Sequence, residues 1–478
     1  MRQAHGVGAV RAGDAAAGAG LPGDPLMLRA AHGLARTCAL LLDGTYGSRV
    51  VLLVGSGGNG GDALHAGAAL ALRGARVDAL LLTDRPHAGG LAALRAAGGR
   101  AGSDAAVLDD ADLVIDGIVG IGGRGGLRED AARLVAHAEA TAATLVAVDV
   151  PSGVDAGTGE VPGAAVHADV TVTFGALKPG LLVDPGAGCA GVVELVDLGP
   201  AFDAALGAPE VEALEAADVA ALLPAPTAES DKYRRGVVGV AAGSDAYTGA
   251  AVLAVGGALR AGAGMVRYSG PDLPTALVRR RWPEAVVGEG RVQAHVVGPG
   301  LGTDDAGLVR LRRVLGDGLP AVVDADGLTL LAGEPPLGGP LVLTPHAGEA
   351  ARLLGADRAD VEARRLEHAQ RAARAYDAVV LLKGSTTVVA APDGRVRVNA
   401  TGTPWLATAG SGDVLSGVVG ALLGGGLDPF DAASAGAWLH GAAGRLASGD
   451  EDGTGLAGGP VVAEDLLDAL PRVRRDLA

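Results

Sequence analysis

The sequence has few aromatic residues and few cysteines. Phe, Tyr and Trp together make up 2% of its 478 residues, and Cys38 and Cys189 are its two cysteines. The hydrophobic cores must therefore be built from Val, Leu and Ala around closely approaching backbones, which favours helices stacked on sheets. Two cysteines without metal-ligand spacing also exclude a disulfide framework and a cysteine-based metal site, as is usual in the reducing cytoplasm.

The sequence also lacks an excess of positive charge and a long hydrophobic run. Its formal net charge is -16, which argues against nucleic acid or an anionic membrane as a partner, because both require a basic face. The longest apolar stretch, roughly residues 414–427, is too short and too rich in glycine to span a bilayer. No charged and then apolar leader opens the chain. We therefore expect a cytoplasmic protein that binds small molecules.

The length of the chain indicates more than one domain, because 478 residues exceed one ordinary hydrophobic core. We predict one domain over residues 1–210 and another over residues 229–478. Between them, residues 211–228 loosen into glycine, proline and alanine around an acidic helix, and we predict a linker there.

Strand-like and helix-like segments alternate in the first half. Short apolar runs predict strands at residues 49–54, 75–82, 113–115 and 144–150, and helices are expected at 63–73 and 91–97. This alternation is typical of a parallel sheet covered on both faces, a Rossmann-like three-layer α/β/α sandwich, with ligands at the carboxyl ends of the strands. The polar residues expected at those ends are Asn59, Asp62, Asp116, Asp149 and Ser152.

The second half repeats the pattern and ends in a glycine loop. Strands are predicted at residues 236–244, 294–297, 321–323, 341–343 and 379–382, and a helix at 248–260, which together indicate a second α/β sandwich. The segment Thr-Ala-Gly-Ser-Gly-Asp at 408–413 then runs directly into an apolar helix. Glycines let the unpaired N–H groups of a helix start close on an anion, and Asp413 would face an arriving hydroxyl. This is a typical phosphoryl-transfer site.

Residues 10–200 resemble the NAD(P)H-hydrate epimerase family, also called YjeF N-terminal. The resemblance rests on the order and spacing of segments 116–126, 148–155 and 173–180. It implies three potassium ligands, Asn59, Asp116 and Ser152. It also implies a hydrate pocket lined by Gly58, Asn59, Gly60, Gly61, Asp62, Gly120, Ile121, Gly122, Gly123, Arg124, Gly125, Gly126 and Asp149. The sequence departs from the family at Gly58, Ala63 and Ile121, where asparagine, glycine and threonine are usual.

Residues 229–470 resemble the ribokinase-like ADP-dependent NAD(P)H-hydrate dehydratases. The motifs that carry this resemblance are segments 298–302, 324–326, 344–349, 383–387, 399–404, 408–413 and 439–441. The resemblance implies that ADP with Mg2+ phosphorylates the hydroxyl of the hydrated nicotinamide, which then leaves as phosphate, with Asp413 as the catalytic residue.

The same resemblance implies two sets of ligand contacts. The residues expected to touch the hydrate are Ala250, Gly302, His346 and Asp413. Those expected to bind the nucleotide are Lys383, Gly384, Ser385, Thr386, Thr387, Gly410, Ser411 and Gly412. Two assignments stay open: His346 either contacts the hydrate or bonds the backbone, and Asp324 and Asp326 either order magnesium-bound water or cap a turn.

The leading interpretation is a bifunctional repair enzyme acting on the R and S hydrates of NADH and NADPH, and we expect a homo-oligomer. One alternative is an ATP-dependent vitamin-precursor or sugar kinase fused to a Rossmann-like domain, and a second is a binding or scaffold protein that has lost catalysis. A third is a dehydrogenase, because Gly55–Gly60 matches G-x-G-x-x-G and Asp84 ends the next strand. Glycine is so frequent, at 79 residues, that this match carries little weight alone.

Overall fold

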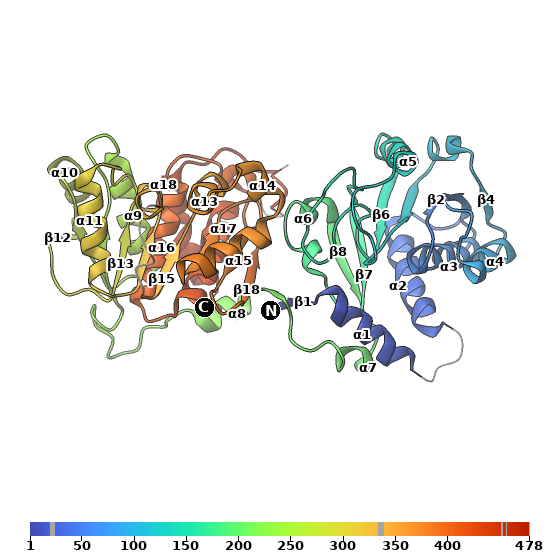
Figure 1. Ribbon diagram of the computed structural model, residues 1–478, viewed down its shortest axis with the longest axis horizontal. Coiled ribbons are helices and arrows are strands. Elements are labelled where there is room, and N and C mark those ends of the chain that lie inside the picture. Colours follow the sequence, from blue (N-terminus) through green and yellow to red (C-terminus); the bar gives the residue numbers. More distant parts are fainter. Residues whose placement is uncertain (20–23, 333–338, 451–452, 456, 478) are drawn as a thin grey trace. The chain divides into compact units, whose positions relative to one another are not determined.

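The computed structural model describes residues 1–19, 24–332, 339–450, 453–455 and 457–477. It divides into two compact units, one formed by residues 3–211 and the other by residues 1–2 and 212–478. Figure 1 shows that each unit is built from a sheet with helices packed against it, which confirms the predicted α/β fold class with two sandwiches. Within the described ranges, no helix combines the length and the apolar character needed to cross a membrane.

The N-terminal unit contains a seven-stranded sheet in the order β4-β3-β2-β5-β6-β7-β8, and all neighbouring strands are parallel. The strands are β2 (Arg49–Val54), β3 (Arg76–Leu81), β4 (Arg100–Gly102), β5 (Leu113–Gly117), β6 (Thr144–Val148), β7 (Val170–Phe174) and β8 (Val192–Val196). The chain proceeds outward in one direction from β2 and in the other from β5. In open parallel sheets, ligands bind at the carboxyl ends of the strands beside such a reversal.

Alternate residues of each strand enter different cores. Val50, Leu52 and Val54 of β2 pack in one core, and Val51 and Leu53 pack in another. The first core includes the helices α1 (Val7–Gly18), α2 (Pro25–Leu41), α3 (Gly58–Leu72) and α4 (Ala88–Ala96). The second includes η1 (Ala105–Leu108) and α5 (Glu129–Glu139), which cover the opposite face of the sheet (Figure 1). Three short helices complete the unit, η2 (Pro179–Leu181), α6 (Gly186–Ala190) and α7 (Pro200–Asp203).

The C-terminal unit contains an eleven-stranded sheet in the order β1-β9-β18-β17-β16-β15-β14-β13-β10-β11-β12. The strands from β12 to β16 pair in parallel, and β17 is antiparallel to both of its neighbours. The strands are β1 (Arg2–Ala4), β9 (Val211–Ala213), β10 (Val237–Ala241), β11 (Met265–Ser269), β12 (Val286–Val287), β13 (Ala294–Val297), β14 (Ala321–Val323), β15 (Leu341–Leu343), β16 (Val379–Leu382), β17 (Thr387–Ala390) and β18 (Val396–Asn399).

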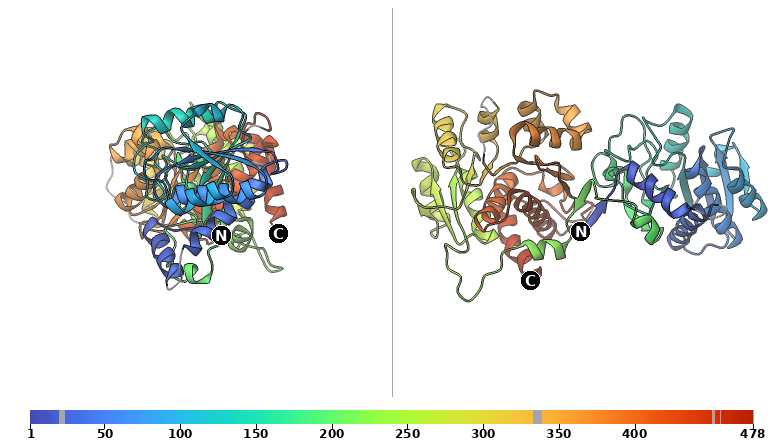
Figure 2. Two further views of the ribbon diagram at one scale, coloured as in Figure 1. Left: turned by 90° about the vertical axis from the view of Figure 1, so that its right-hand side faces the viewer. Right: turned by 60° about the horizontal axis from the view of Figure 1, so that its bottom comes forward.

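Helices cover both faces of this sheet. One face carries α9 (Thr248–Ala261), α10 (Asp272–Arg281), α16 (Ser411–Gly424), α17 (Pro429–Ser448) and α18 (Ala463–Asp476). The other face carries α11 (Asp305–Gly316), α12 (Asp326–Leu331), α13 (Ala347–Leu354), α14 (Arg358–Ala363) and α15 (Arg365–Tyr376). The right-hand view of Figure 2 shows the red helices beyond residue 411 on one side and the orange-brown α13–α15 on the other. Two short helices, α8 (Ala216–Leu222) and η3 (Pro404–Leu406), complete the unit.

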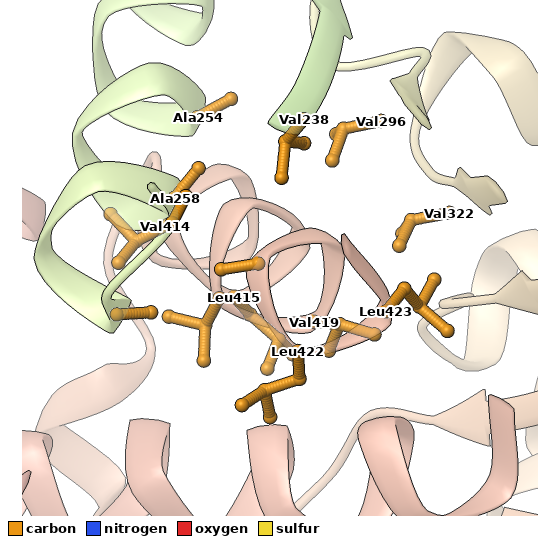
Figure 3. Close-up of a cluster of buried hydrophobic side chains, with 14 of the residues drawn as sticks. Val238, Ala254, Ala258, Val296, Val322, Val414, Leu415, Val419, Leu422 and Leu423 are labelled. Carbon is orange, nitrogen blue, oxygen red and sulfur yellow. The ribbon is translucent and has the colours of Figure 1, made fainter. Parts of the chain in front are cut away.

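The helices α9 and α16 pack backbone to backbone (Figure 3). A Cβ atom placed on Gly417 would lie 2.2 Å from the Ala254 carbonyl oxygen, and one placed on Gly257 would lie 2.3 Å from the Val414 carbonyl oxygen. Glycine at both positions therefore permits the contact. In Figure 3, Val414, Leu415 and Val419 of α16 fill the space around this contact and the strands β10 and β13. This packing fixes where α16 begins, and its first turn carries Asp413.

The observed division differs from the predicted one at the linker. Residues 211–222 form β9 and α8, and β9 extends the sheet of the C-terminal unit beside β18. Two acidic residues at the start of α8 pair with the chain's N-terminus, because the amino group of Met1 contacts Glu215 at 2.9 Å and Asp218 at 2.6 Å. The first residues of the chain therefore belong to the C-terminal unit.

Candidate active sites

In the N-terminal unit, the glycine loop after β2 closes tightly against the loop after β5. A Cβ atom on Gly55 would lie 1.9 Å from the Ile118 carbonyl oxygen, and one on Gly60 would lie 2.3 Å from the Gly55 carbonyl oxygen. The helix α3 begins at Gly58, so the prediction of a helix start at residue 63 was wrong. The N-cap, Gly57, has φ of 99°, a value that glycine adopts without strain. Residues 58–62 thus form the first turn of α3, whose free N–H groups attract anions.

Asp116 and Ser152 bond to each other and to the loop after β5. The Ser152 hydroxyl lies 2.7 Å from Asp116 Oδ1, and the Ser152 N–H donates to Asp116 Oδ2 over 2.9 Å. The same hydroxyl accepts from the Val119 N–H at 2.9 Å and lies 3.0 Å from the Val119 carbonyl oxygen. Burial raises the pKa of Asp116 to about 6, although hydrogen bonds from Ser152 and Ile118 act against the rise.

Asn59 lies beside the same loop. Its Oδ1 is 2.7 Å from the position that a Cβ atom of Gly120 would occupy. Its Nδ2 is buried and has no hydrogen-bond partner among the described residues. The three predicted potassium ligands therefore converge on residues 117–120. Their donors are carboxylate, hydroxyl and amide groups, a set that suits a hard cation, so the site fits the ion that the sequence predicted.

The first residue of the predicted pocket loop at residues 120–126 lies beside Asn59, and the rest of the loop is largely open to solvent. Ile121 is partly buried and packs against two apolar clusters, while Gly122, Arg124, Gly125 and Gly126 are exposed. A Cβ atom on Gly126 would lie 2.7 Å from Gly163 Cα, so this end of the loop contacts a second loop. The segment is therefore exposed and rich in glycine, with close contacts at both of its ends.

Asp149 forms an ion pair with a lysine that the sequence analysis did not select as a site residue. Lys178 is fully buried, and its Nζ donates to Asp149 Oδ1 at 2.5 Å, Thr173 Oγ1 at 2.8 Å and the Phe174 carbonyl oxygen at 2.9 Å. Asp149 has φ of 69°, a left-handed value that strains a residue other than glycine. The signal was present in segment 173–180, because a lysine in an apolar segment needs a buried acid.

Two further carboxyl groups of this unit belong to the same electrostatic cluster. Burial raises the pKa of Asp62 to about 8, and the charges of Asp149, Asp14 and Asp24 add to the rise. Burial also raises the pKa of Asp14, again with a contribution from Asp149. Asp14 lies on α1, far from the glycine loops in sequence. Nothing in its local sequence distinguishes it, so this residue was missed.

In the C-terminal unit, the glycine loop leads directly into α16 as predicted. Gly410 is the N-cap with φ of 87°, and Ser411, Gly412 and Asp413 form the first turn. The Ser411 hydroxyl donates within the loop, 2.9 Å from the Leu406 carbonyl oxygen. Nε2 of His440 on α17 donates to the Ser411 carbonyl oxygen over 2.9 Å, and burial lowers the His440 pKa to about 4. A neutral histidine missed as a site residue therefore holds the helix start in place.

The surroundings of the Asp413 carboxyl group disfavour its ionised form. Burial and then the Asp324 carboxylate raise the Asp413 pKa to about 7, with Asp326 and Glu349 adding to the rise and Lys383 opposing it. A general base with a pKa near the working pH is the most effective for proton transfer. Asp413 is placed to accept a proton from a hydroxyl bound at the start of α16.

Lys383 reaches the start of α16 from the end of β16. Its Nζ lies 2.8 Å from Asp324 Oδ1 and 3.8 Å from Glu349 Oε2. A Cβ atom on Gly412 would lie 3.4 Å from this Nζ. Asp324 is 1% exposed, and its other oxygen accepts from the Ser416 hydroxyl over 2.7 Å. Both oxygens of Asp324 therefore have protein partners, which favours a structural role over ordering magnesium-bound water.

The rest of the predicted nucleotide loop is organised by a buried arginine. The guanidinium of Arg365 donates to the Lys383 carbonyl oxygen at 2.8 Å and to the Thr386 carbonyl oxygen at 3.3 Å. Arg365 fills the space beside Gly384, because a Cβ atom there would overlap its guanidinium. Sequence reasoning missed Arg365, which lies 18 positions before Lys383. Ser385, Thr386 and Thr387 follow in the loop and at the start of β17.

The residues predicted to touch the hydrate in this unit also make hydrogen bonds or close contacts with neighbouring parts of the protein. His346 Nδ1 accepts from the N–H groups of Gly348 at 3.0 Å and Glu349 at 3.2 Å, so the ring caps α13, and its Nε2 lies 3.5 Å from Glu349 Oε1. Gly302 donates its N–H to Asp326 Oδ2 over 2.9 Å, which means that Asp326 orders a turn. Ala250 lies beside this turn, because a Cβ atom added to Gly300 would be 2.9 Å from the Cβ atom of Ala250.

Comparison with known proteins assigns each unit to a family. Residues 23–180 match the model described as YjeF-related protein N-terminus, and residues 238–463 match the model described as NAD(P)H-hydrate dehydratase. The chain is 50% identical over 448 residues to the bifunctional NAD(P)H-hydrate repair enzyme of Mycobacterium tuberculosis, covering 91% of this chain and 92% of that protein. It is 36% identical over 466 residues to the Escherichia coli enzyme of the same name, covering 94% and 89%.

A solved structure resembles the C-terminal unit. The ADP/ATP-dependent NAD(P)H-hydrate dehydratase from Bacillus subtilis, co-crystallised with ATP and Mg2+, is 33% identical and covers 56% of this chain and 99% of its own, with a TM-score of 0.52. The two family matches follow the chain in the predicted order, and the relatives span nearly its whole length. The chain belongs to the family of bifunctional NAD(P)H-hydrate repair enzymes.

Proposed function

We propose that this chain restores damaged nicotinamide cofactors in two steps. The N-terminal unit interconverts the R and S hydrates of NADH and NADPH, and the C-terminal unit dehydrates the S hydrate at the expense of ADP. The observation that carries the second step is Asp413 in the first turn of α16, behind the N-cap Gly410. A carboxyl group with a pKa of about 7 stands there beside the first-turn N–H groups, which have no partner within the helix.

The dehydration follows from this arrangement. The hydrate hydroxyl gives its proton to Asp413 as its oxygen bonds to the β-phosphorus of ADP, and the bond from that phosphorus to the bridging oxygen breaks, with its electron pair leaving on AMP. The N–H groups of Gly410, Ser411 and Gly412 support the transferring phosphoryl group. Phosphate then leaves ring carbon 6 with the electron pair of the carbon–oxygen bond, and a proton lost from ring carbon 5 completes the double bond.

The nucleotide is ADP with Mg2+, bound by the loop at residues 383–387. The B. subtilis relative was crystallised with ATP and Mg2+, which supports a magnesium nucleotide in this fold. Asp324, Asp326, Glu349 and Asp413 give this site more acidic than basic groups. Mg2+ would offset the charge of the phosphates there, and the oxygen of Asp326 that does not bind Gly302 is the carboxylate oxygen suited to hold a magnesium-bound water.

The epimerase site lies between the first turn of α3, the loop at 120–126 and Asp149, and K+ binds at Asn59, Asp116 and Ser152. A bound K+ would balance the Asp116 charge and hold the loop after β5. Asp116→Ala removes the only formal charge of the three ligands, so it should raise the K+ requirement of epimerisation more than Ser152→Ala. Titrating K+ against the rate on pure R hydrate tests this order, and the reverse order would contradict the assignment.

The remaining alternative of the same fold is a kinase. Incubating the protein with mixed NADH hydrates and ADP, while following the absorbance of reduced nicotinamide, distinguishes the two functions. A repair enzyme restores the absorbance and releases AMP and phosphate in equal amounts. A kinase leaves a phosphate ester and no recovery. A homo-oligomeric state and a cytoplasmic location stay predictions.

A further inference from the structure

The carboxylate of Asp324 links two elements that meet at the start of α16. Asp324 directly follows β14, its Oδ1 accepts from the Lys383 ammonium at 2.8 Å, and its Oδ2 accepts from the Ser416 hydroxyl at 2.7 Å. Ser416 lies one turn into α16 and also contacts the Gly412 carbonyl oxygen at 3.0 Å. The position of the ammonium relative to the anion-binding turn is therefore set by one buried side chain.

The Lys383 ammonium keeps N–H groups that can donate to a further acceptor. A lysine has three N–H groups, and Asp324 takes one of them, while Glu349 lies too far away, at 3.8 Å, for a hydrogen bond. The side chain of Lys383 is 22% exposed, in contrast to the fully enclosed Lys178 of the other unit. The ammonium thus has N–H groups left to donate, and it lies beside Gly412, the residue whose N–H would support the transferring phosphoryl group.

We propose that Asp324 is a positioning residue that holds the Lys383 ammonium against the first turn of α16, where the ammonium neutralises the phosphoryl group as it passes from ADP to the hydrate. This inference rests on the proposed dehydratase function. It separates Lys383 from the rest of the loop at 384–387: the loop binds the nucleotide before and after transfer, while the Lys383 charge acts on the group in transit.

The geometry supports action during transfer over simple nucleotide binding. The ion pair with the buried Asp324 holds the ammonium, and a bond from the Lys383 N–H to the Pro345 carbonyl oxygen at 2.8 Å holds the Lys383 backbone. A cation held rigidly next to backbone donors stabilises charge that develops in a transition state, because the groups need no rearrangement. A flexible lysine in an adenine pocket would need no buried carboxylate.

The test is a double-mutant cycle on the full chain with pure S hydrate and ADP. Lys383→Met should lower kcat by about 10²-fold, the usual effect of removing one transition-state donor. Asp324→Asn keeps the shape of the side chain and should lower kcat by most of that factor, with the KM for ADP changed much less. At a pH above the Asp413 pKa of about 7, where that base is ionised in every variant, Asp324→Asn added to Lys383→Met should have almost no further effect, because residues that act as one unit are not additive.

If the losses in kcat of the two single variants multiply in the double variant, the proposal is overturned, because Asp324 then acts independently of Lys383. A rise in the KM for ADP at unchanged kcat would also overturn it, because the pair would serve ground-state binding. ADP binding measured by calorimetry shows that each variant is folded. Should Asp324→Asn fold poorly, Lys383→Arg is compared with Lys383→Met: the retained charge should recover part of kcat, and equal losses would overturn the proposal. Failure of wild-type protein to dehydrate the S hydrate would instead reject the proposed function itself.

Discussion

At the scale of single residues, the Asp413 carboxyl group carries the chemistry of the C-terminal unit. Asp413→Asn keeps the shape of the side chain but cannot accept a proton. We therefore expect dehydration of the S hydrate to fall by roughly 10²–10⁴, while ADP still binds through the loop at 383–387. Steady-state rates and calorimetric ADP binding check both parts. Turnover near that of the wild type would contradict the assignment of Asp413.

The pH dependence of this step follows from the environment of Asp413. The base must be ionised to accept a proton, and burial raises its pKa to about 7. The kcat for dehydration should therefore rise with pH up to about 7 and level off above it. A rate that is already constant at pH 5 would mean that a group with an ordinary carboxyl pKa limits the reaction.

The same pKa shift predicts that the ionised Asp413 carboxylate, which the reaction needs, lowers the stability of the fold. Because the folded state raises the Asp413 pKa from 3.8 to about 7, folding favours the protonated form. The contribution of this group to stability is therefore present below pH 3.8 and is lost as the pH rises through 7. Asp413→Asn removes the ionisable group, so at pH 8 the variant should unfold at higher temperature than the wild type, with a smaller difference at pH 5. A lower unfolding temperature at pH 8 would contradict this.

Residue roles were predictable where chemistry is local in sequence. Gly410, Ser411, Gly412 and Asp413 are consecutive, so one motif contains the whole anion-binding turn. Asp324 is different, because its partners Lys383 and Ser416 lie 59 and 92 positions away. Its ion pair exists because parallel strands bring their carboxyl ends together, and a sequence pattern does not specify which side chains then meet. Asp14 was missed because nothing in its local sequence distinguishes it, whereas a lysine within the apolar segment 173–180 did give a signal for Lys178.

At the scale of elements, the contact between α9 and α16 depends on glycine. Gly417→Ala would place a Cβ atom 2.2 Å from the Ala254 carbonyl oxygen, which belongs to the backbone and has little room to move. We expect the free energy of unfolding to fall by about 1–3 kcal/mol or more. Gly316→Ala is the matched control, because Gly316 ends α11 and nothing lies within 4 Å of the added atom. Denaturant unfolding compares the two, and equal effects would contradict the proposed role of the close contact.

Strands were easier to predict than helix starts. The predicted strands at 49–54, 294–297, 321–323, 341–343 and 379–382 agree with β2, β13, β14, β15 and β16, because buried parallel strands are short apolar runs between turns. The start of α3 was misplaced by five residues, since Gly58, Gly60 and Gly61 were interpreted as loop. Gly60 packs against the Gly55 carbonyl and Gly61 against the side chains of Met27 and His87, and this tertiary packing holds the segment in a helix despite its low propensity.

At the scale of the whole molecule, the account divides two reactions between two units with separate sheets. The order of the motifs predicted both units, and the family matches confirm it. The boundary was less predictable, because Met1 pairs with Glu215 and Asp218 and β9 joins the sheet of the C-terminal unit. A loose segment between two patterned regions gives no sign that an edge strand forms there.

The most direct test of this division is the conversion of pure R hydrate with ADP by two variants, alone and mixed. At a K+ concentration that just suffices for the wild type, Asp116→Ala should lack epimerisation but still dehydrate S hydrate, and Asp413→Asn should epimerise without dehydrating. Each variant alone should repair R hydrate no faster than the background rate measured without enzyme. An equal mixture should recover the absorbance of reduced nicotinamide, because each variant supplies one step. A mixture no faster than either variant alone, or Asp116→Ala acting equally on R and S hydrates, would contradict two independent sites.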